Sequence, residues 1–159
     1  MLSKKSVARL VAGQVLSMYY DPANDDGNVE SLLKTLNDHF IIPNFTGRDG
    51  RSVYTKVYRS RFTLGLIKGV LATIEKLDSG IVSYLNDGSS ISRLDSMVLQ
   101  SLRLAHFELT NSNLSGKIIV SEYVDIVAEF CDKDYTAFAN KVLDRMASDL
   151  RGQRKNGDG

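Results

Sequence analysis

The side chains best suited to acid–base or nucleophilic chemistry are few in this sequence: two histidines, His39 and His106, and one cysteine, Cys131. A thiolate pair of Cys131 with His106 is the one nucleophilic arrangement that they allow. A lone cysteine on a helix beside Phe130 is more often a small buried hydrophobic residue, and each histidine has an ordinary structural interpretation at a helix end or beside an apolar stripe. We therefore predict no catalytic residues.

The spacings that hold metals or nucleotides are also missing from the sequence. One cysteine and two histidines give no zinc-binding pattern. Gly47 and Gly50 do not form a phosphate loop, because no GxxxxGK[ST] or GxGxxG run precedes a helix. We expect no metal site and no cofactor, and the sequence predicts a protein that is not an enzyme.

Charge is unevenly distributed along the chain, although the net charge is only +1. The N-terminal segment carries Lys4, Lys5 and Arg9 and has no acidic residue before Asp21. Cations at the start of a helix oppose its dipole, which favours an external anionic partner such as RNA phosphate. The alternative interpretation, a solvated first helical turn, stays open.

Composition indicates one ordinary globular domain: 159 residues, of which 43% are hydrophobic and 25% are charged. Cys131 has no partner for an internal disulfide, which favours the reducing cytoplasm. Gln14 interrupts the apolar stretch near the N-terminus, so we do not interpret that stretch as a signal peptide. No run reaches the roughly 18 apolar residues of a membrane span, and we predict no membrane partner.

Apolar residues recur at helical spacing along nearly the whole chain, and no convincing alternating strand appears. Asn28 is a plausible cap for the second helix, and Ser92 and Asp95 have the spacing of a capping box. A turn-rich surface loop is expected over residues 41–52. The fold class predicted is all-α, with six to seven helices, over residues 8–19, 29–40, 62–77, 94–109, 119–130 and 135–150.

Glycine-rich and turn-rich stretches divide the predicted helices into groups. We expect an N-terminal helical subdomain over residues 1–79, a C-terminal helical subdomain over residues 80–151 and a disordered tail over residues 152–159. Gly152 is a reasonable end for the last helix. Gly65 and Gly69 lie on adjacent turns, where a partner helix can approach closely.

Three short runs follow one another in the second half of the chain: residues 102–109 (LRLAHFEL), residues 117–122 (KIIVSE) and residues 138–144 (FANKVLD). In their order and spacing, these runs resemble the NusB family of transcription antitermination factors. Gly69 with Val70, Leu77 with Asp78, and the start of the chain also look like the family, so that the resemblance covers about residues 4–151.

The resemblance implies a fold and a binding function. The fold is two small three-helix bundles that pack across one another. The function is that of a non-catalytic RNA-binding antitermination factor, which binds the single-stranded boxA RNA of ribosomal RNA leaders together with NusE, a ribosomal small-subunit protein. The resemblance also implies membership of an antitermination complex with RNA polymerase. Some family members self-associate, so a homodimer is a further expectation.

Site residues follow from the resemblance position by position. The family's RNA-binding residues correspond to the basic start of the chain and to the start of the last helix, where an aromatic ring can stack on an unpaired base. The family's NusE-facing glutamate corresponds to Glu108, which the helical pattern places at the edge of the apolar stripe. The RNA-binding residues expected are Lys4, Lys5, Arg9, Asp134 and Phe138.

Arg103 and Glu122 also match family positions, and here the residues themselves suggest a structural role. Glu122 lies at the edge of an apolar helix face, where a carboxylate needs a partner, and Arg103 is the obvious candidate. We predict a structural ion pair between these two side chains.

The chain departs from the family pattern at positions that bear on RNA affinity. Ser6 and Val7 stand where the family often has cations, and Lys141 replaces a glycine. Two alternatives therefore stay open. One is a protein-interaction module that binds NusE with little intrinsic RNA affinity, and the other is a helical accessory domain of a ribosomal RNA methyltransferase.

Overall fold

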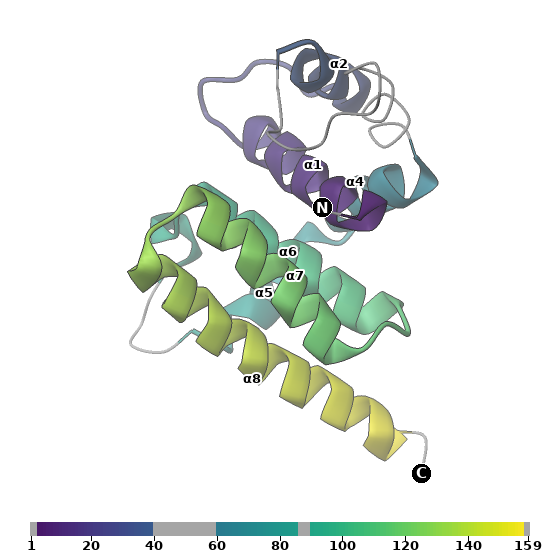
Figure 1. Ribbon diagram of the computed structural model, residues 1–159, viewed down its shortest axis with the longest axis vertical. Helices are drawn as coiled ribbons and strands as arrows, with labels where there is room; N and C mark the ends of the chain where they lie inside the picture. The colour runs from purple at the N-terminus through teal and green to yellow at the C-terminus, as the bar shows by residue number, and fades with distance from the viewer. Residues whose placement is uncertain (1–2, 40–59, 86–89, 158–159) are drawn as a thin grey trace. The chain divides into compact units, whose positions relative to one another are not determined.

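The computed structural model describes residues 3–39, 60–85 and 90–157, and every regular element in these ranges is a helix. The predicted all-α fold class is confirmed. None of the helices in these ranges is long and apolar enough to cross a membrane. The elements, shown in Figure 1, are α1 (Lys4–Tyr19), α2 (Val29–His39), α4 (Arg61–Ala72), α5 (Ile74–Val82), the short 3-10 helix η1 (Ile91–Arg93), α6 (Ser96–Asn111), α7 (Gly116–Phe130) and α8 (Lys133–Gly157).

The first of two compact units comprises Met1–Lys68 and contains α1, α2 and the start of α4. The side-chain oxygen of Ser3 accepts the backbone N–H of Ser6 at 3.0 Å and caps α1. Asn28 caps α2 as predicted, because its side-chain oxygen accepts the N–H of Ser31 at 3.2 Å. Helices α1 and α2 pack together, and their buried residues include Val11, Val15, Leu32, Leu33 and Leu36.

The second unit, Gly69–Gly159, is built around α6. This helix packs against α5, α7 and α8, and α7 packs against α8 along its length (Figure 1). The core is formed by the apolar stripes that the sequence predicts, and it includes Val98, Leu102, Ala105, Leu109, Tyr123, Val127, Leu143 and Met146. Two glycines allow close packing on α6: a Cβ at Gly69 would overlap the Phe107 ring, and one at Gly80 would lie 2.6 Å from Nε2 of His106. Gly65 has no such neighbour within 4 Å.

The single helix predicted over residues 62–77 is wrong, because α4 ends at Ala72 and α5 begins at Ile74. Thr73 separates them with φ −123° and ψ 21°, outside the helical region. Its hydroxyl donates to the Gly69 carbonyl at 2.7 Å, and its N–H bonds to the carbonyl of Val70 rather than to that of Gly69. The threonine side chain thus takes the carbonyl that the next helical N–H would use.

The start of α6 also differs from the prediction. Asp95, not Ser92, is the N-cap, and its carboxylate accepts the N–H groups of Met97 at 2.9 Å and Val98 at 3.4 Å. Ser92 belongs to η1, which Ser90 caps by accepting the N–H of Ser92 at 3.2 Å. A single aspartate that satisfies two backbone donors is a stronger start signal than the capping-box spacing.

The division between the two units falls at residues 68 and 69, not at residues 79 and 80 as predicted. Helix α5 packs on α6, which places it in the second unit. At the C-terminus, α8 continues through Gly152 to Gly157, so the predicted helix end at Gly152 is wrong. The expected loop over residues 41–52 lies outside the described residues, as do residues 86–89 and the side chain of His39.

Candidate nucleic-acid and partner interfaces

The start of α1 presents two of the three predicted cations to solvent. Lys4 and Lys5 are exposed in the first turn, which has no acidic residue. The third predicted cation, Arg9, is only 2% exposed, and its role in RNA binding stays a prediction. Its guanidinium lies over the ring of Phe62, 5.2 Å from the ring centroid. Arg9 is one helical turn beyond Lys5, and at that depth the helix is buried on every side.

The start of α8 brings together exposed acidic and aromatic side chains. Asp132 precedes the helix and its carboxylate accepts the N–H of Tyr135 at 3.0 Å, while Asp134 is exposed in the first turn. Tyr135 is 43% exposed, and Phe130, at the end of α7, is 42% exposed. Phe138 is half-buried, so it contributes both to the packing and to the surface. A groove of about 350 Å³ runs between the end of α7 and the start of α8.

Glu108, which the sequence places at the edge of the apolar stripe, lies in the interior of the second unit. It is 3% exposed, and Tyr123 on α7 donates its hydroxyl to the Glu108 carboxylate at 2.5 Å. The predicted helix over residues 119–130 contains Tyr123, but the helical pattern does not predict its contact with Glu108. The signal was available, because a buried tyrosine hydroxyl needs a hydrogen-bond partner and a buried carboxylate needs a donor.

Arg103 is held by Asp78, a partner that the sequence analysis did not identify. Its Nε and one terminal nitrogen each donate to an Asp78 carboxylate oxygen at 2.8 Å, and a third nitrogen donates to the Gln100 side chain at 3.2 Å. This two-pronged geometry is the strong form of an arginine–carboxylate contact. The pairing of Arg103 with Glu122 stays a prediction, and Glu122 is half-exposed on α7.

Burial shifts the pKa values of titratable side chains in the second unit, including His106 and Cys131. Burial lowers the pKa of His106, and the nearby Lys76 lowers it further. Burial and the Asp95 carboxylate raise the pKa of the Cys131 thiol to about 11, which disfavours the thiolate. Among the described residues there is no group of three or more His, Cys, Asp or Glu side chains suited to a metal ion.

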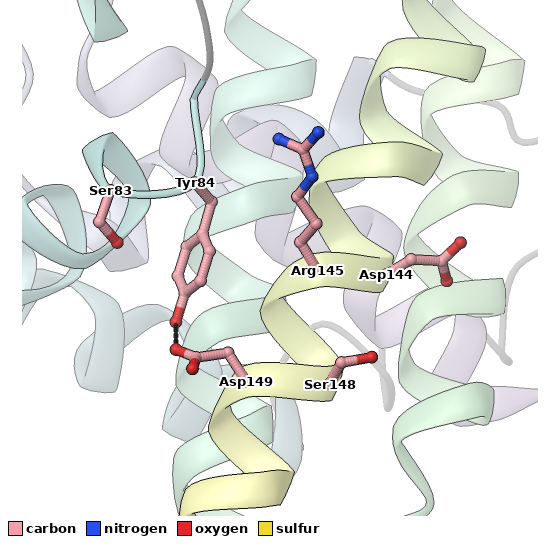
Figure 2. A pocket seen from close by; sticks show the side chains of 6 residues that line it. All are labelled: Ser83, Tyr84, Asp144, Arg145, Ser148 and Asp149. Atoms are coloured by element: carbon pink, nitrogen blue, oxygen red, sulfur yellow. Dashed lines mark hydrogen bonds between the residues drawn. The ribbon is translucent and has the colours of Figure 1, made fainter.

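A second hollow, of about 740 Å³, lies between the end of α5 and α8 and is shown in Figure 2. Tyr84 reaches across it and donates its hydroxyl to Asp149, while Arg145 points away from this contact. Burial and Asp149 together raise the pKa of Tyr84 to about 12, so the phenol stays protonated near neutral pH. The hollow is therefore crossed by a hydrogen bond that joins the segment after α5 to α8.

The described residues thus form a set of packed helices, and their candidate sites are the charged and aromatic side chains at the starts of α1 and α8. The NusB family model matches residues 6–148, and the chain belongs to the NusB family. It is 30% identical over 151 residues to the transcription antitermination protein NusB of Caulobacter vibrioides, covering 94% of this chain and 96% of that protein. Over 154 residues it is 32% identical to the NusB of Sinorhizobium fredii, and this match covers 96% of this chain and 91% of that protein.

Solved structures show the same fold. The chain is similar to T. maritima NusB with a TM-score of 0.67 and 21% identity, covering 93% of each chain. It is also similar, with a TM-score of 0.68 and 25% identity, to a chain in the crystal structure of the antitermination factors NusB and NusE in complex with dsRNA. That match covers 93% of this chain and 98% of the other.

Proposed function

We propose that this protein is a non-catalytic transcription antitermination factor that binds boxA RNA of ribosomal RNA leaders together with NusE. The observation that carries the proposal is the match, over 93% of the chain, to a chain in the crystal structure of NusB and NusE with dsRNA. Membership of the NusB family supports it independently. The proposal extends to a cytoplasmic location, to a complex with RNA polymerase and to self-association as a homodimer.

The exposed cations of α1 support the RNA-binding part of the proposal. Lys4 and Lys5 face solvent in a turn without acidic residues, so no carboxylate of that turn competes with phosphate for them. Arg9 is 2% exposed, so a direct contact between its guanidinium and RNA requires the side chain to move outward. Two exposed lysines bind phosphate as point charges and lack the two-pronged grip of arginine, so the affinity of this segment alone is expected to be modest.

The start of α8 offers a second RNA-contacting segment with a different chemistry. Phe138 is half-buried and Tyr135 is exposed, and a ring with an open face can stack on an unpaired base. Stacking of this kind is worth about 1–3 kcal/mol per base. Asp134 lies in the first turn of the same helix, where it complements the helix dipole whether or not RNA is bound.

Glu108 can contact NusE only if the side chains that cover it move, because it is 3% exposed and its carboxylate already accepts the Tyr123 hydroxyl. This requirement separates Glu108 from Lys4 and Lys5, which are exposed. The partner role of Glu108 is therefore a part of the proposal that can fail by itself.

Fluorescence anisotropy of a labelled boxA oligoribonucleotide, with and without saturating NusE, tests the proposal. We expect NusE to increase the affinity, and K4A/K5A to weaken binding and to lower the salt slope by about 0.7 for each phosphate that the variant no longer binds. The matched control is K34A/K117A, which removes two exposed lysines from α2 and α7. Equal binding by the two double variants, or no gain from NusE, would contradict RNA binding through α1.

The burial of Arg9 favours one second candidate function, a protein-interaction module with little intrinsic RNA affinity. It leaves Lys4 and Lys5 as the exposed cations of α1. In the same assay, a chain with this function binds NusE but gives no anisotropy change with boxA RNA at any salt concentration.

A further inference from the structure

The ring of Phe62, in the first turn of α4, lies against two cations of α1. The ammonium nitrogen of Lys5 is 5.3 Å from the ring centroid, and the guanidinium carbon of Arg9 is 5.2 Å from it. Both distances are within the roughly 6 Å at which a cation is attracted by the negative face of an aromatic ring. All three residues belong to the first compact unit.

The two cations differ in depth although they share the ring. Lys5 and Arg9 are four residues apart, so their side chains lie on the same face of α1. Lys5 is exposed, Phe62 is half-buried and Arg9 is buried. The ring therefore links a cation in the interior to a cation at the surface.

A lysine side chain is flexible, and ordering it on a ligand costs conformational entropy. An ammonium group that already lies beside a ring loses less of this freedom when a phosphate arrives. The ring takes up no hydrogen-bond donor of the ammonium group, whose three N–H bonds stay available to phosphate oxygens. A ring beside Lys5 thus pre-orders the cation without neutralising it.

We infer that Phe62 is a positioning residue of the RNA surface: it holds the Lys5 ammonium group at the start of α1 in an orientation that favours phosphate binding. The inference rests on the proposed function, because it names a residue that acts through Lys5 on the same ligand. Phe62 itself does not need to touch the RNA.

The test compares F62L, which keeps an apolar side chain but removes the ring face, with F62Y, which keeps the ring. Affinity for the boxA oligoribonucleotide is measured with NusE saturating. We expect F62L to weaken binding about two- to fivefold, which is the range of an exposed cation–ring contact, and F62Y to restore it. The affinity of F62L for NusE alone should match that of the unchanged chain.

A double-variant comparison shows whether Phe62 acts through Lys5. In a K5A background, F62L should cause no further loss of RNA affinity. In a K4A background, which removes the neighbouring lysine, F62L should cause its full two- to fivefold loss. In the free protein, NMR should show ring-shifted side-chain signals of Lys5 that move to ordinary positions in F62L.

The outcomes separate this inference from the proposed function. If the unchanged chain binds RNA and F62L binds equally well, the inference is wrong and the proposed function stands. If F62L and F62Y lose affinity equally, or if F62L acts fully in the K5A background, Phe62 serves packing and the inference is also wrong. A chain that binds no RNA overturns the proposed function and this inference with it, whatever the NMR signals of Lys5 show.

Discussion

The centre of α6 and the start of α1 use charge in opposite ways. On α6, Arg103 is fixed by two 2.8 Å contacts to Asp78, and Glu108 is fixed by Tyr123. On α1, Lys4 and Lys5 lie in solvent. A charge removed from water must keep its internal partners, whereas a solvated charge stays available to a ligand. Burial, rather than position in a basic segment, thus decides which charges are held by internal partners and which stay available to a ligand.

The variant D78A should have the largest effect on stability, because it leaves the Arg103 guanidinium without its main partner. We expect a loss of about 3 kcal/mol in the free energy of unfolding, at the lower end for a broken buried pair because the Asp78 side chain is 29% exposed. Urea unfolding measures it. The control D144A removes an exposed carboxylate from α8 and should change stability by less than about 0.5 kcal/mol. An equal loss of stability in D78A and D144A would mean that the contact between Asp78 and Arg103 contributes no more than a solvated charge does.

The variant Y123F should have the next largest effect. It removes the hydroxyl that donates to the buried Glu108 carboxylate, and a hydrogen bond to a charged group contributes about 1.5–3 kcal/mol. The matched control is Y135F, since Tyr135 is 43% exposed. The same variant tests the partner role of Glu108, because a carboxylate released from Tyr123 should bind NusE more tightly. Unchanged NusE affinity in a folded Y123F variant would count against that role.

The sequence predicts most helices of this fold because their apolar periodicity is a local property. The periods that end near Tyr19, Phe130 and Asn111 coincide with helix ends in the structure. Thr73 shows where periodicity fails: the apolar stripe continues across it, but its hydroxyl binds the Gly69 carbonyl and ends α4. An apolar stripe indicates which residues are buried, and buried residues continue on both sides of the point where one helix ends and the next begins.

The candidate sites were predictable only in part, because depth depends on tertiary packing. Lys5 and Arg9 look alike in the sequence, yet the structure exposes the first and buries the second. The helical pattern places Glu108 at the edge of the apolar stripe, but its hydrogen bond depends on α7, which supplies Tyr123. Nothing in the sequence pattern indicates that Phe62 contacts the cations of α1, since this contact joins segments far apart in the sequence.

His106 extends the comparison to pH. Burial, aided by Lys76, lowers its pKa in the folded chain below the ordinary value of 6.5, so the unfolded chain binds more protons between the two pKa values. Stability from this residue is fully present above pH 6.5 and is lost as the pH falls toward the folded-state pKa, by at most about 1.4 kcal/mol for each pH unit. The free energy of unfolding, measured with urea from pH 7.5 to pH 5, should therefore decline less in H106Q than in the unchanged chain. Parallel declines would mean that His106 is solvated.

The variant K4Q should have the smallest effect on stability, and of the opposite sign to the others. A cation in the first turn opposes the dipole of α1, so its removal should raise the free energy of unfolding by about 0.3 kcal/mol. The control K141Q, in the middle of α8, removes an exposed lysine far from either helix end and should leave stability unchanged. RNA affinity should fall in K4Q although the fold becomes slightly more stable. Lower RNA affinity together with higher stability identifies a charge that serves binding. Replacing a residue that serves the fold would instead lower the stability of the protein. If K4Q destabilised the chain, Lys4 would belong with Arg103 and Glu108 and not with the proposed RNA surface.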